Sequence, residues 1–320
     1  MNENQIFTGM SDASGAAALD ENSFIVANDE DNDLRIYHVN KPDEPQLIKL
    51  SEVFKDEIFD GEDLEIDIEG AAGLGDRIFW IGSHSASKKG KFREARHRLF
   101  AIKIARSGDS GEFSAVAAGQ IYTKLITDLA NDARFEAYNL GAGQTIKPKD
   151  IGGLSIEGLT ATPDGALLIG FRNPLGGGRV VDGFLVDGRA LVVKLLNPLD
   201  VIEGRAARFD DPIELDLGGF GIRNLEYYKA ENQYLIVGGP YHENDDTPEH
   251  PRETNRLYLW SGDPNNAPEM LENINLEGFN IEAAFFFPQL ENSIMLLSDD
   301  GKGGTTNSFR AISVDLKQFS

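Results

Sequence analysis

The sequence predicts an all-β protein, a β-propeller of five four-stranded blades, which we expect to form one domain over residues 1–320. The first observation is a strand pair of one design that recurs five times along the chain. The second is a further apolar strand with one arginine after each pair. The third is the glycine content, 34 of 320 residues, which falls in short turn clusters and indicates many short strands.

Each repeat begins with a short motif that leads through a first strand and a turn into a second, strongly apolar strand. The motifs are Ser14-Gly15-Ala16, Ile68-Glu69-Gly70, Ile156-Glu157-Gly158, Ile222-Arg223-Asn224 and Ile281-Glu282-Ala283. The second strands lie at residues 24–26, 78–81, 167–169, 234–237 and 294–297. Two apolar runs joined by a short turn of Gly, Asn, Asp or Pro form a β-hairpin. The sequence therefore predicts one hairpin per blade.

A third and a fourth strand complete each predicted blade. The third strands contain Arg35, Arg98, Arg189, Arg256 and Arg310, and the fourth strands lie at residues 46–50, 113–121, 212–217 and 270–276. An arginine that recurs once per repeat indicates a structural function. The fifth repeat ends the chain without a fourth strand, which residues 4–9 can supply. Such a strand closes the ring and removes both free sheet edges.

The second repeat contains an insertion near residues 121–137. Apolar side chains recur there at helical spacing, at Leu125, Ile126, Leu129 and Phe135, which predicts a helix between two blades. A sixth blade hidden in this stretch is the alternative.

The composition limits the partners. A formal net charge of −23, from 30 basic and 53 acidic residues, would repel nucleic acid and anionic membranes, so we expect neither as a partner. No apolar run is long enough to span a membrane, and the chain opens without the pattern of a signal peptide, so we expect a soluble protein in an unspecified compartment. The absence of cysteine excludes disulfides, thiolate catalysis and zinc–sulfur sites. The oligomeric state stays open.

The repeat also predicts where a functional site lies. In an antiparallel hairpin, the start of the first strand and the end of the second share one end of the sheet. The predicted pairs are Ser14 with Asp29, Glu69 with His84, Glu157 with Arg172, Arg223 with Gly239, and Glu282 with Asp299. If the first strand is innermost, these residues ring one mouth of the axial channel. The long loops after the second strands emerge at the same end, and such loops commonly carry function.

The predicted ring gathers carboxylates that need compensation. Glu69, Glu157 and Glu282 come from different blades, with Asp29 and Asp299 close by. Two like charges 5 to 6 Å apart cost about 3 kcal/mol at an effective dielectric constant of about 20. A bound Ca²⁺, the guanidinium groups of Arg172 and Arg223, or protonation of one carboxyl group could each supply the compensation, and the sequence leaves all three open.

Two functions are compatible with this ring. The first is a metal-assisted hydrolase of a phosphoester or related anionic ester, in which His84 carries a proton and Arg172 holds the substrate's charge. Arg223 and the basic segment that contains Lys89 and Arg96 would bind an anionic group. The alternative is a non-catalytic propeller that binds a small ligand or a protein, because the sequence contains no specific catalytic motif. In both cases we expect a small anionic ligand or substrate.

Several phrases resemble an uncharacterised bacterial family that is known only as a domain of unknown function. They are Ala27-Asn28-Asp29-Glu30-Asp31, Asp67-Ile68-Glu69-Gly70 to Gly82-Ser83-His84-Ser85, and Ser155-Ile156-Glu157-Gly158-Leu159 to Phe171-Arg172-Asn173-Pro174. The likeness covers nearly the whole chain and implies no established activity.

More distantly, the Ile-Glu-Gly motifs are similar to those of phytase-like and esterase-like propellers and of calcium-dependent nucleotidases. That resemblance implies an axial Ca²⁺ with Glu69, Glu157 and Glu282 as ligands. The chain departs from the pattern, since Ser14 and Arg223 occupy two of the five equivalent positions and several of these relatives have six blades.

Overall fold

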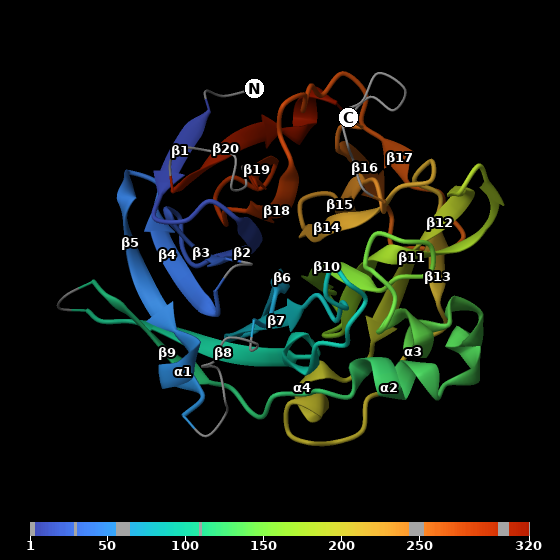
Figure 1. Cartoon of the computed structure of the whole chain (residues 1–320). Helices are drawn as coiled ribbons and strands as arrows, with labels where there is room; N and C mark the ends of the chain where they lie inside the picture. The colour runs from blue at the N-terminus through green and yellow to red at the C-terminus, as the bar shows by residue number, and fades with distance from the viewer. Residues whose placement is uncertain are drawn as a thin grey trace.

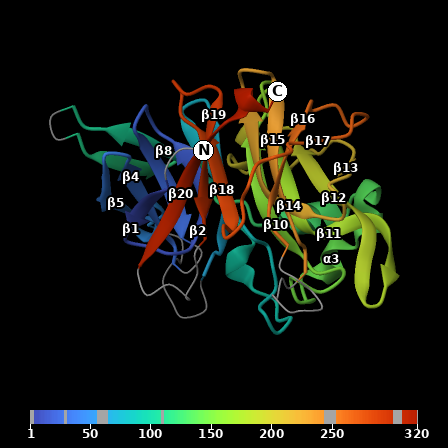
Figure 2. The same cartoon turned by 90° about the horizontal axis from the view of Figure 1, so that it is seen from above.

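The computed structural model describes residues 4–28, 31–55, 65–108, 111–242, 253–299 and 307–319. The strands form five antiparallel four-stranded sheets arranged around a centre, as the sequence predicts (Figure 1). The first strand of each sheet, β2, β6, β10, β14 or β18, lies nearest the centre. Adjacent innermost strands contact one another, and Figure 2 shows β18, β14 and β10 side by side.

Four blades are continuous in sequence. The first contains β2 (Ala13–Ala18), β3 (Ser23–Asn28), β4 (Asp33–His38) and β5 (Lys41–Lys49). The second contains β6 (Ile68–Leu74), β7 (Arg77–Gly82), β8 (Leu99–Arg106) and β9 (Phe113–Ala117). The third contains β10 (Ser155–Ala161), β11 (Leu167–Val181), β12 (Phe184–Leu195) and β13 (Ile213–Leu215). The fourth contains β14 (Gly221–Tyr228), β15 (Gln233–Gly239), β16 (Arg256–Trp260) and β17 (Glu269–Met270).

The fifth blade joins the two ends of the chain. It consists of β18 (Ile281–Phe286), β19 (Ser293–Ser298), β20 (Ser308–Asp315) and the N-terminal β1 (Gln5–Thr8), which pairs antiparallel with β20. The predicted ring closure by the N-terminal strand is therefore confirmed. Phe7 of β1 stacks on Phe309 at 5.2 Å and meets Phe24 of the first blade edge-on at 5.1 Å, so the closing strand anchors two blades.

The glycines of the repeat motif allow the blades to approach one another at the centre. A Cβ atom on Gly15 would lie 2.9 Å from the carbonyl carbon of Gly70 in the second blade. A Cβ on Gly70 would in turn lie 2.8 Å from Cβ of Leu159, and one on Gly158 would lie 2.8 Å from a methyl group of Ile222. Each motif glycine in the first three blades thus packs against the next blade.

The predicted insertion between the second and third blades is helical. It contains α2 (Leu125–Ala130), the 3₁₀ helix η2 (Ala133–Tyr138) and α3 (Leu140–Gly143), so the single predicted helix is three short ones. α2 and α3 lie at the periphery of the ring in Figure 1. Their buried side chains share one core cluster with strands of the second and third blades, and this packing accounts for the helical spacing. Residues 121–137 are all described, and they contain no sixth blade.

The remaining helices are short. They are α1 (Leu50–Val53), η1 (Glu94–Arg96), α4 (Pro198–Val201) and η3 (Leu316–Gln318). No helix in the described ranges is long and apolar enough to cross a membrane.

Several predicted segments differ from the structure. The fourth strands of the second and fourth blades are shorter than expected, ending at Ala117 and Met270. Residues 172–188, expected to form a loop, belong mostly to β11 and β12, which continue beyond the blade as a two-stranded ribbon (yellow-green in Figure 1). Its tip is an Asp182-Gly183 turn with φ of 50° and 89°, the pairing typical of a tight hairpin turn.

Replacing Phe7 with alanine is expected to lower the free energy of unfolding by about 3 to 5 kcal/mol, because it leaves a cavity between two blades. Urea denaturation measures the change. Ile6→Ala on the same strand is the matched control, since Ile6 is 55% exposed, and should change the free energy by less than about 0.5 kcal/mol. Equal effects of the two substitutions would contradict closure by packing of Phe7.

Candidate functional site

Every innermost strand contains a register shift at the position predicted for the axial ring. The shifts fall between Ala13 and Ala16, Ile68 and Gly70, Ile156 and Gly158, Ile222 and Asn224, and Ile281 and Ala283. The bulged residues are therefore Ser14 with Gly15, Glu69, Glu157, Arg223 and Glu282. A β-bulge re-aims a side chain and is common next to functional sites. The five blades thus share one local device at one mouth of the channel.

The bulged side chains of three neighbouring blades meet in a chain of ion pairs. Nη1 of Arg223 lies 3.0 Å from Oε2 of Glu157, and its Nη2 pairs with Oε1 of Glu282. Arg172, at the end of the second strand of the third blade, donates from Nη1 to Oε1 of Glu157 over 3.1 Å. The Ser155 hydroxyl donates to the same oxygen. We call Glu157, Arg172, Arg223 and Glu282 the axial network.

The charges of the axial network stabilise one another. Burial alone would raise the pKa of Glu157, but Arg223 and Arg172 outweigh it and hold the pKa below its ordinary value. Burial lowers the pKa of the Arg223 guanidinium, and the Glu157 carboxylate opposes that change. Glu157 is therefore ionised at neutral pH, and of the three forms of compensation that the sequence left open, guanidinium groups neutralise it.

The other predicted carboxylates lie around the network to different extents. Glu69 and Asp299 both raise the pKa of Arg223 electrostatically, so they lie near it. Asn280 donates to Oε1 of Glu282 over 2.9 Å and to Oδ2 of Asp299 over 3.3 Å, which links Asp299 to the network. Asp29 lies outside the described residues. Sequence reasoning missed Asn280, although it directly precedes the fifth repeat motif.

Arg96, predicted to bind an anion, is held within its own blade. Its Nη1 lies 2.7 Å from Oδ2 of Asp67 and its Nη2 lies 3.1 Å from Oε2 of Glu65. The Ser83 and Ser85 hydroxyl groups donate to the same Asp67 oxygen. Burial raises the pKa of Asp67, and Arg96 opposes the rise. Sequence reasoning missed Asp67, which is buried and adjacent to the second repeat motif.

His84 is fully enclosed. Its Nδ1 lies 2.8 Å from the Gly82 carbonyl oxygen, and its ring packs edge-on against His97 at 5.1 Å. Burial, and secondarily His97, lowers the pKa of His84 to about 3. Its Nε2 has no hydrogen-bond partner within the described ranges. His84 is thus neutral at physiological pH, and no described contact joins it to Glu157 or Arg172, so proton transfer by this side chain would require a rearrangement.

Lys89 is exposed on the segment between β7 and β8. In the described part of the chain, Arg172 and Arg223 share the carboxylate of Glu157, whereas no ion pair connects the Lys89 ammonium group to that carboxylate.

An axial calcium ion does not fit the described residues. Ca²⁺ takes six to eight oxygen ligands. Both carboxylate oxygens of Glu157 and Oε1 of Glu282 bind guanidinium groups instead. Among the residues that the structure describes, no three His, Asp or Glu side chains are grouped as metal ligands.

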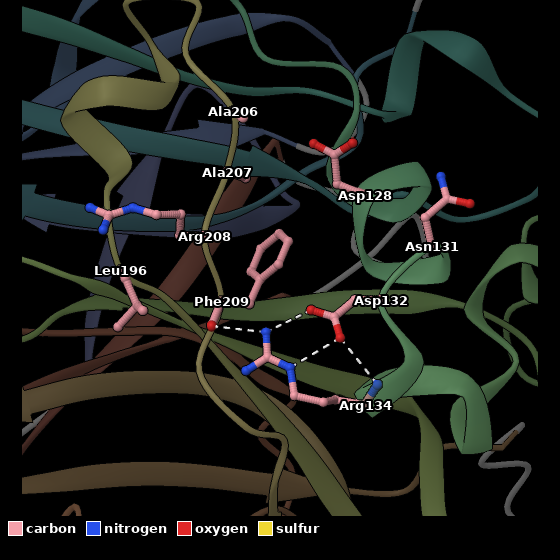
Figure 3. Close-up of a pocket in the computed structure, with 9 residues that line it drawn as sticks. All are labelled: Asp128, Asn131, Asp132, Arg134, Leu196, Ala206, Ala207, Arg208 and Phe209. Atoms are coloured by element: carbon pink, nitrogen blue, oxygen red, sulfur yellow. Dashed lines mark hydrogen bonds and ion pairs between the residues drawn. The ribbon is translucent and has the colours of Figure 1, made fainter.

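A cavity of about 550 Å³ lies on the outer flank, between α2, η2 and the segment before β13 (Figure 3). Its main charged groups are paired with each other, because Arg134 binds the Asp132 carboxylate and the Phe209 carbonyl oxygen. Its lining residues belong to the insertion and to the outer part of the third blade, so this cavity is separate from the axial network.

The comparison with protein families assigns the chain. The model of a family described as a protein of unknown function, DUF3616, matches residues 12–110 and 105–274. The protein belongs to this family. The expected membership in an uncharacterised propeller family is confirmed, and DUF3616 membership brings no assigned activity. No curated protein matches the sequence.

Solved structures resemble this DUF3616 protein only distantly. Glutaminyl cyclase from Myxococcus xanthus is 10% identical with a TM-score of 0.45, covering 97% of this chain and 94% of that one. A putative oxidoreductase (glucose dehydrogenase) from a Thermus species is 13% identical with a TM-score of 0.46, covering 98% and 100%. Regucalcin from Agrobacterium tumefaciens is 11% identical with a TM-score of 0.40, covering 96% and 92%. At these identities the neighbours carry no information on substrate.

Replacing Glu157 with glutamine is expected to lower the free energy of unfolding at pH 7 by about 3 to 5 kcal/mol, because it leaves two buried guanidinium groups without their shared carboxylate. Urea denaturation measures the change. Glu44→Gln is the control, since its pair with Lys41 is exposed and should contribute no more than about 1 kcal/mol.

The ion pairs of Glu157 with Arg223 and Arg172 make the stability of the protein depend on pH. The folded-state pKa of Glu157 lies below its ordinary value of 4.5, so the stabilisation by these ion pairs is complete above that pH and is lost as the pH falls through the folded-state pKa. The stability difference between wild type and Glu157→Gln should therefore narrow in acid. A difference that stays constant from pH 7 to pH 3 would show that Glu157 is not stabilised as the anion.

Proposed function

We propose that this DUF3616 protein is a binding propeller that holds a small ligand with a carboxylate or phosphate group at the axial mouth, through Arg223 and Arg172. The observation that carries the proposal is that the guanidinium group of Arg223 is buried with one donor lacking an acceptor. Its side chain is buried and its Nε has no hydrogen-bond partner within the described ranges. A guanidinium group offers five donor hydrogens, and a buried donor without an acceptor costs about 1 to 3 kcal/mol. An acceptor oxygen of a ligand removes that cost.

The carboxylates of the axial network support this function by fixing the guanidinium groups. Glu157 binds Arg223 and Arg172 through different oxygens, and Glu282 holds Arg223 from the neighbouring fifth blade. Arg172 is held further by the Pro240 carbonyl oxygen, which accepts from its Nε over 3.0 Å. Binding groups that are held in place before the ligand arrives lose little entropy on binding.

The charge around the network limits the ligand. Glu69 and Asp299 lie near Arg223, and the chain carries a formal net charge of −23. A polyanion would meet repulsion over most of the surface, whereas one carboxylate or phosphate group contacts mainly the two guanidinium groups. The ligand class is therefore a small molecule with a single anionic group.

The competing function is calcium-assisted hydrolysis of a phosphoester or related anionic ester. The Ile-Glu-Gly motifs and the gathering of Glu69, Glu282 and Asp299 near Arg223 support it. The described residues do not provide a calcium cage, and His84 is enclosed and neutral at physiological pH. The binding function therefore accounts for more of the geometry.

Calorimetric titration of inorganic phosphate and of acetate into the wild-type protein tests the proposal. Arg223→Lys keeps the charge but removes the forked donor geometry, and it should weaken binding at least about tenfold. Arg172→Lys is a second variant with a smaller expected loss, and Arg205→Lys, whose pairs with Asp200 and Glu203 are on the surface, is the control. Binding unchanged in Arg223→Lys, or absent in the wild type, would refute the proposal. Release of phosphate from a phosphoester panel only when Ca²⁺ is added would instead establish the hydrolase.

A further inference from the structure

A second cavity lies at the mouth of the channel opposite the axial network. It has a volume of about 410 Å³ and takes lining residues from all five innermost strands, among them Ala17, Ala71, Ala161, Glu226 and Phe286. In each innermost strand the bulged residue lies near the beginning and the other end lines this cavity, so the two sites occupy opposite ends of the same strands. Cavities of a few hundred Å³ with apolar walls and few polar groups are typical of small-molecule sites.

Glu226 is the acid inside this cavity. It follows Arg223 by three positions on β14, and its side chain makes no hydrogen bond or ion pair within the described ranges. Burial raises its pKa to about 8. Ala17, Ala71 and Ala161 line the same cavity, and their methyl groups cannot donate a hydrogen bond to it. A carboxyl group left without a partner against apolar walls is unfavourable, and a ligand that pairs with it would offset this cost.

The remaining titratable side chains of the cavity are Tyr227, Lys229 and Glu291. Lys229 and Glu291 are exposed and lie toward the open side, with opposite charges. The backbone N–H of Tyr227 donates to the Thr160 hydroxyl, so that hydroxyl is engaged within the wall. Glu226 is thus the acidic group placed to meet a ligand inside the cavity.

These features define the chemistry of a ligand. A protonated amine donates strong, charge-assisted hydrogen bonds to a carboxylate, and the attraction increases where water is excluded. A short apolar body would pack against the alanines, and the ring of Phe286 offers a further surface that attracts cations. A neutral apolar molecule would leave Glu226 without a partner.

We propose that this mouth of the channel is a binding site for a small organic ammonium compound, whose amine pairs with Glu226 and whose apolar part packs against Ala17, Ala71 and Phe286. The site is independent of the axial network and of the ligand proposed there, because the two share no residue.

The proposal predicts that binding releases a proton. At pH 7 free Glu226 is mostly protonated, whereas the ion pair needs the carboxylate, so complex formation expels close to one proton up to about pH 7 and about half a proton at pH 8. The association constant should therefore rise by up to about tenfold per pH unit from pH 6 to pH 7 and level off above pH 8.

Calorimetric titration of n-pentylammonium chloride at pH 6, 7 and 8 tests the proposal, with n-pentanol as the uncharged control. The wild-type protein should bind the ammonium ion more tightly as the pH rises, whereas its affinity for the alcohol should be the same at all three pH values. Glu226→Gln keeps the shape and should abolish the pH dependence and weaken binding at least about thirtyfold. Glu291→Gln at the rim is the matched control and should stay within about threefold of the wild type.

Three outcomes would overturn the proposal. They are equal ammonium binding by wild type and Glu226→Gln, absence of binding by the wild type at millimolar ammonium, and binding of pentanol as tight as that of pentylammonium. Glu226→Gln replaces a half-buried carboxyl group with an amide of nearly the same size, so thermal unfolding of this variant should match the wild type and shows that a loss of binding is not a loss of fold.

Discussion

The buried ion pairs among Glu157, Arg223 and Glu282 are the interaction on which the axial mouth depends. They join three successive blades through side chains that have left water, so each charge needs the next one. Truncating any member would leave its neighbour as an uncompensated buried charge, which costs more than the pair itself contributes. On the side of the second blade the connection is a main-chain hydrogen bond, from the Ile156 N–H to the Ser83 carbonyl oxygen at 2.9 Å. Ion pairs between side chains therefore connect the third, fourth and fifth blades at the mouth, and a main-chain hydrogen bond connects the third blade to the second.

The repeat motif shows how much of this architecture the sequence could predict. The strand pairs, the ring closure by residues 4–9 and the position of the ring residues follow from periodicity, because each blade repeats the same hairpin. In Ile-Glu-Gly each residue has a separate physical function: the isoleucine is core, the glutamate is bulged, and the glycine admits the neighbouring blade. Counting along a hairpin was enough to pair Glu157 with Arg172, since those two positions lie at the same end of one sheet.

Contacts between blades could not be read in the same way. Arg223 binds carboxylates of two other blades, and no local pattern says which of the available partners it takes. The same holds within one blade for Arg96, because its partner Asp67 is distant in sequence and comes close only when the blade folds. Glu226 was missed for another reason. In a strand with one solvent-exposed face, the alternation of apolar and polar residues predicts that an acid after Leu225 is exposed. The innermost strand of a propeller blade instead faces the central channel, and the Glu226 side chain lies there. We expected a loop in place of the β11–β12 ribbon, although the Asp182-Gly183 pair is typical of a tight hairpin turn and could have predicted it.

The two ends of the channel have opposite chemistry: fixed guanidinium groups lie at one end, and at the other lies an acid among alanines that forms no ion pair with the described residues. The account of the molecule nevertheless stands on the coupling between blades through Glu157 and Arg223. A double-mutant cycle with Glu157→Gln and Arg223→Gln, measured by urea denaturation at pH 7, tests this coupling most directly. We predict a coupling free energy of at least about 1.5 kcal/mol, with the double variant less destabilised than the sum of the single ones. Effects that add to within about 0.5 kcal/mol would show that the two side chains do not depend on each other and would contradict the account.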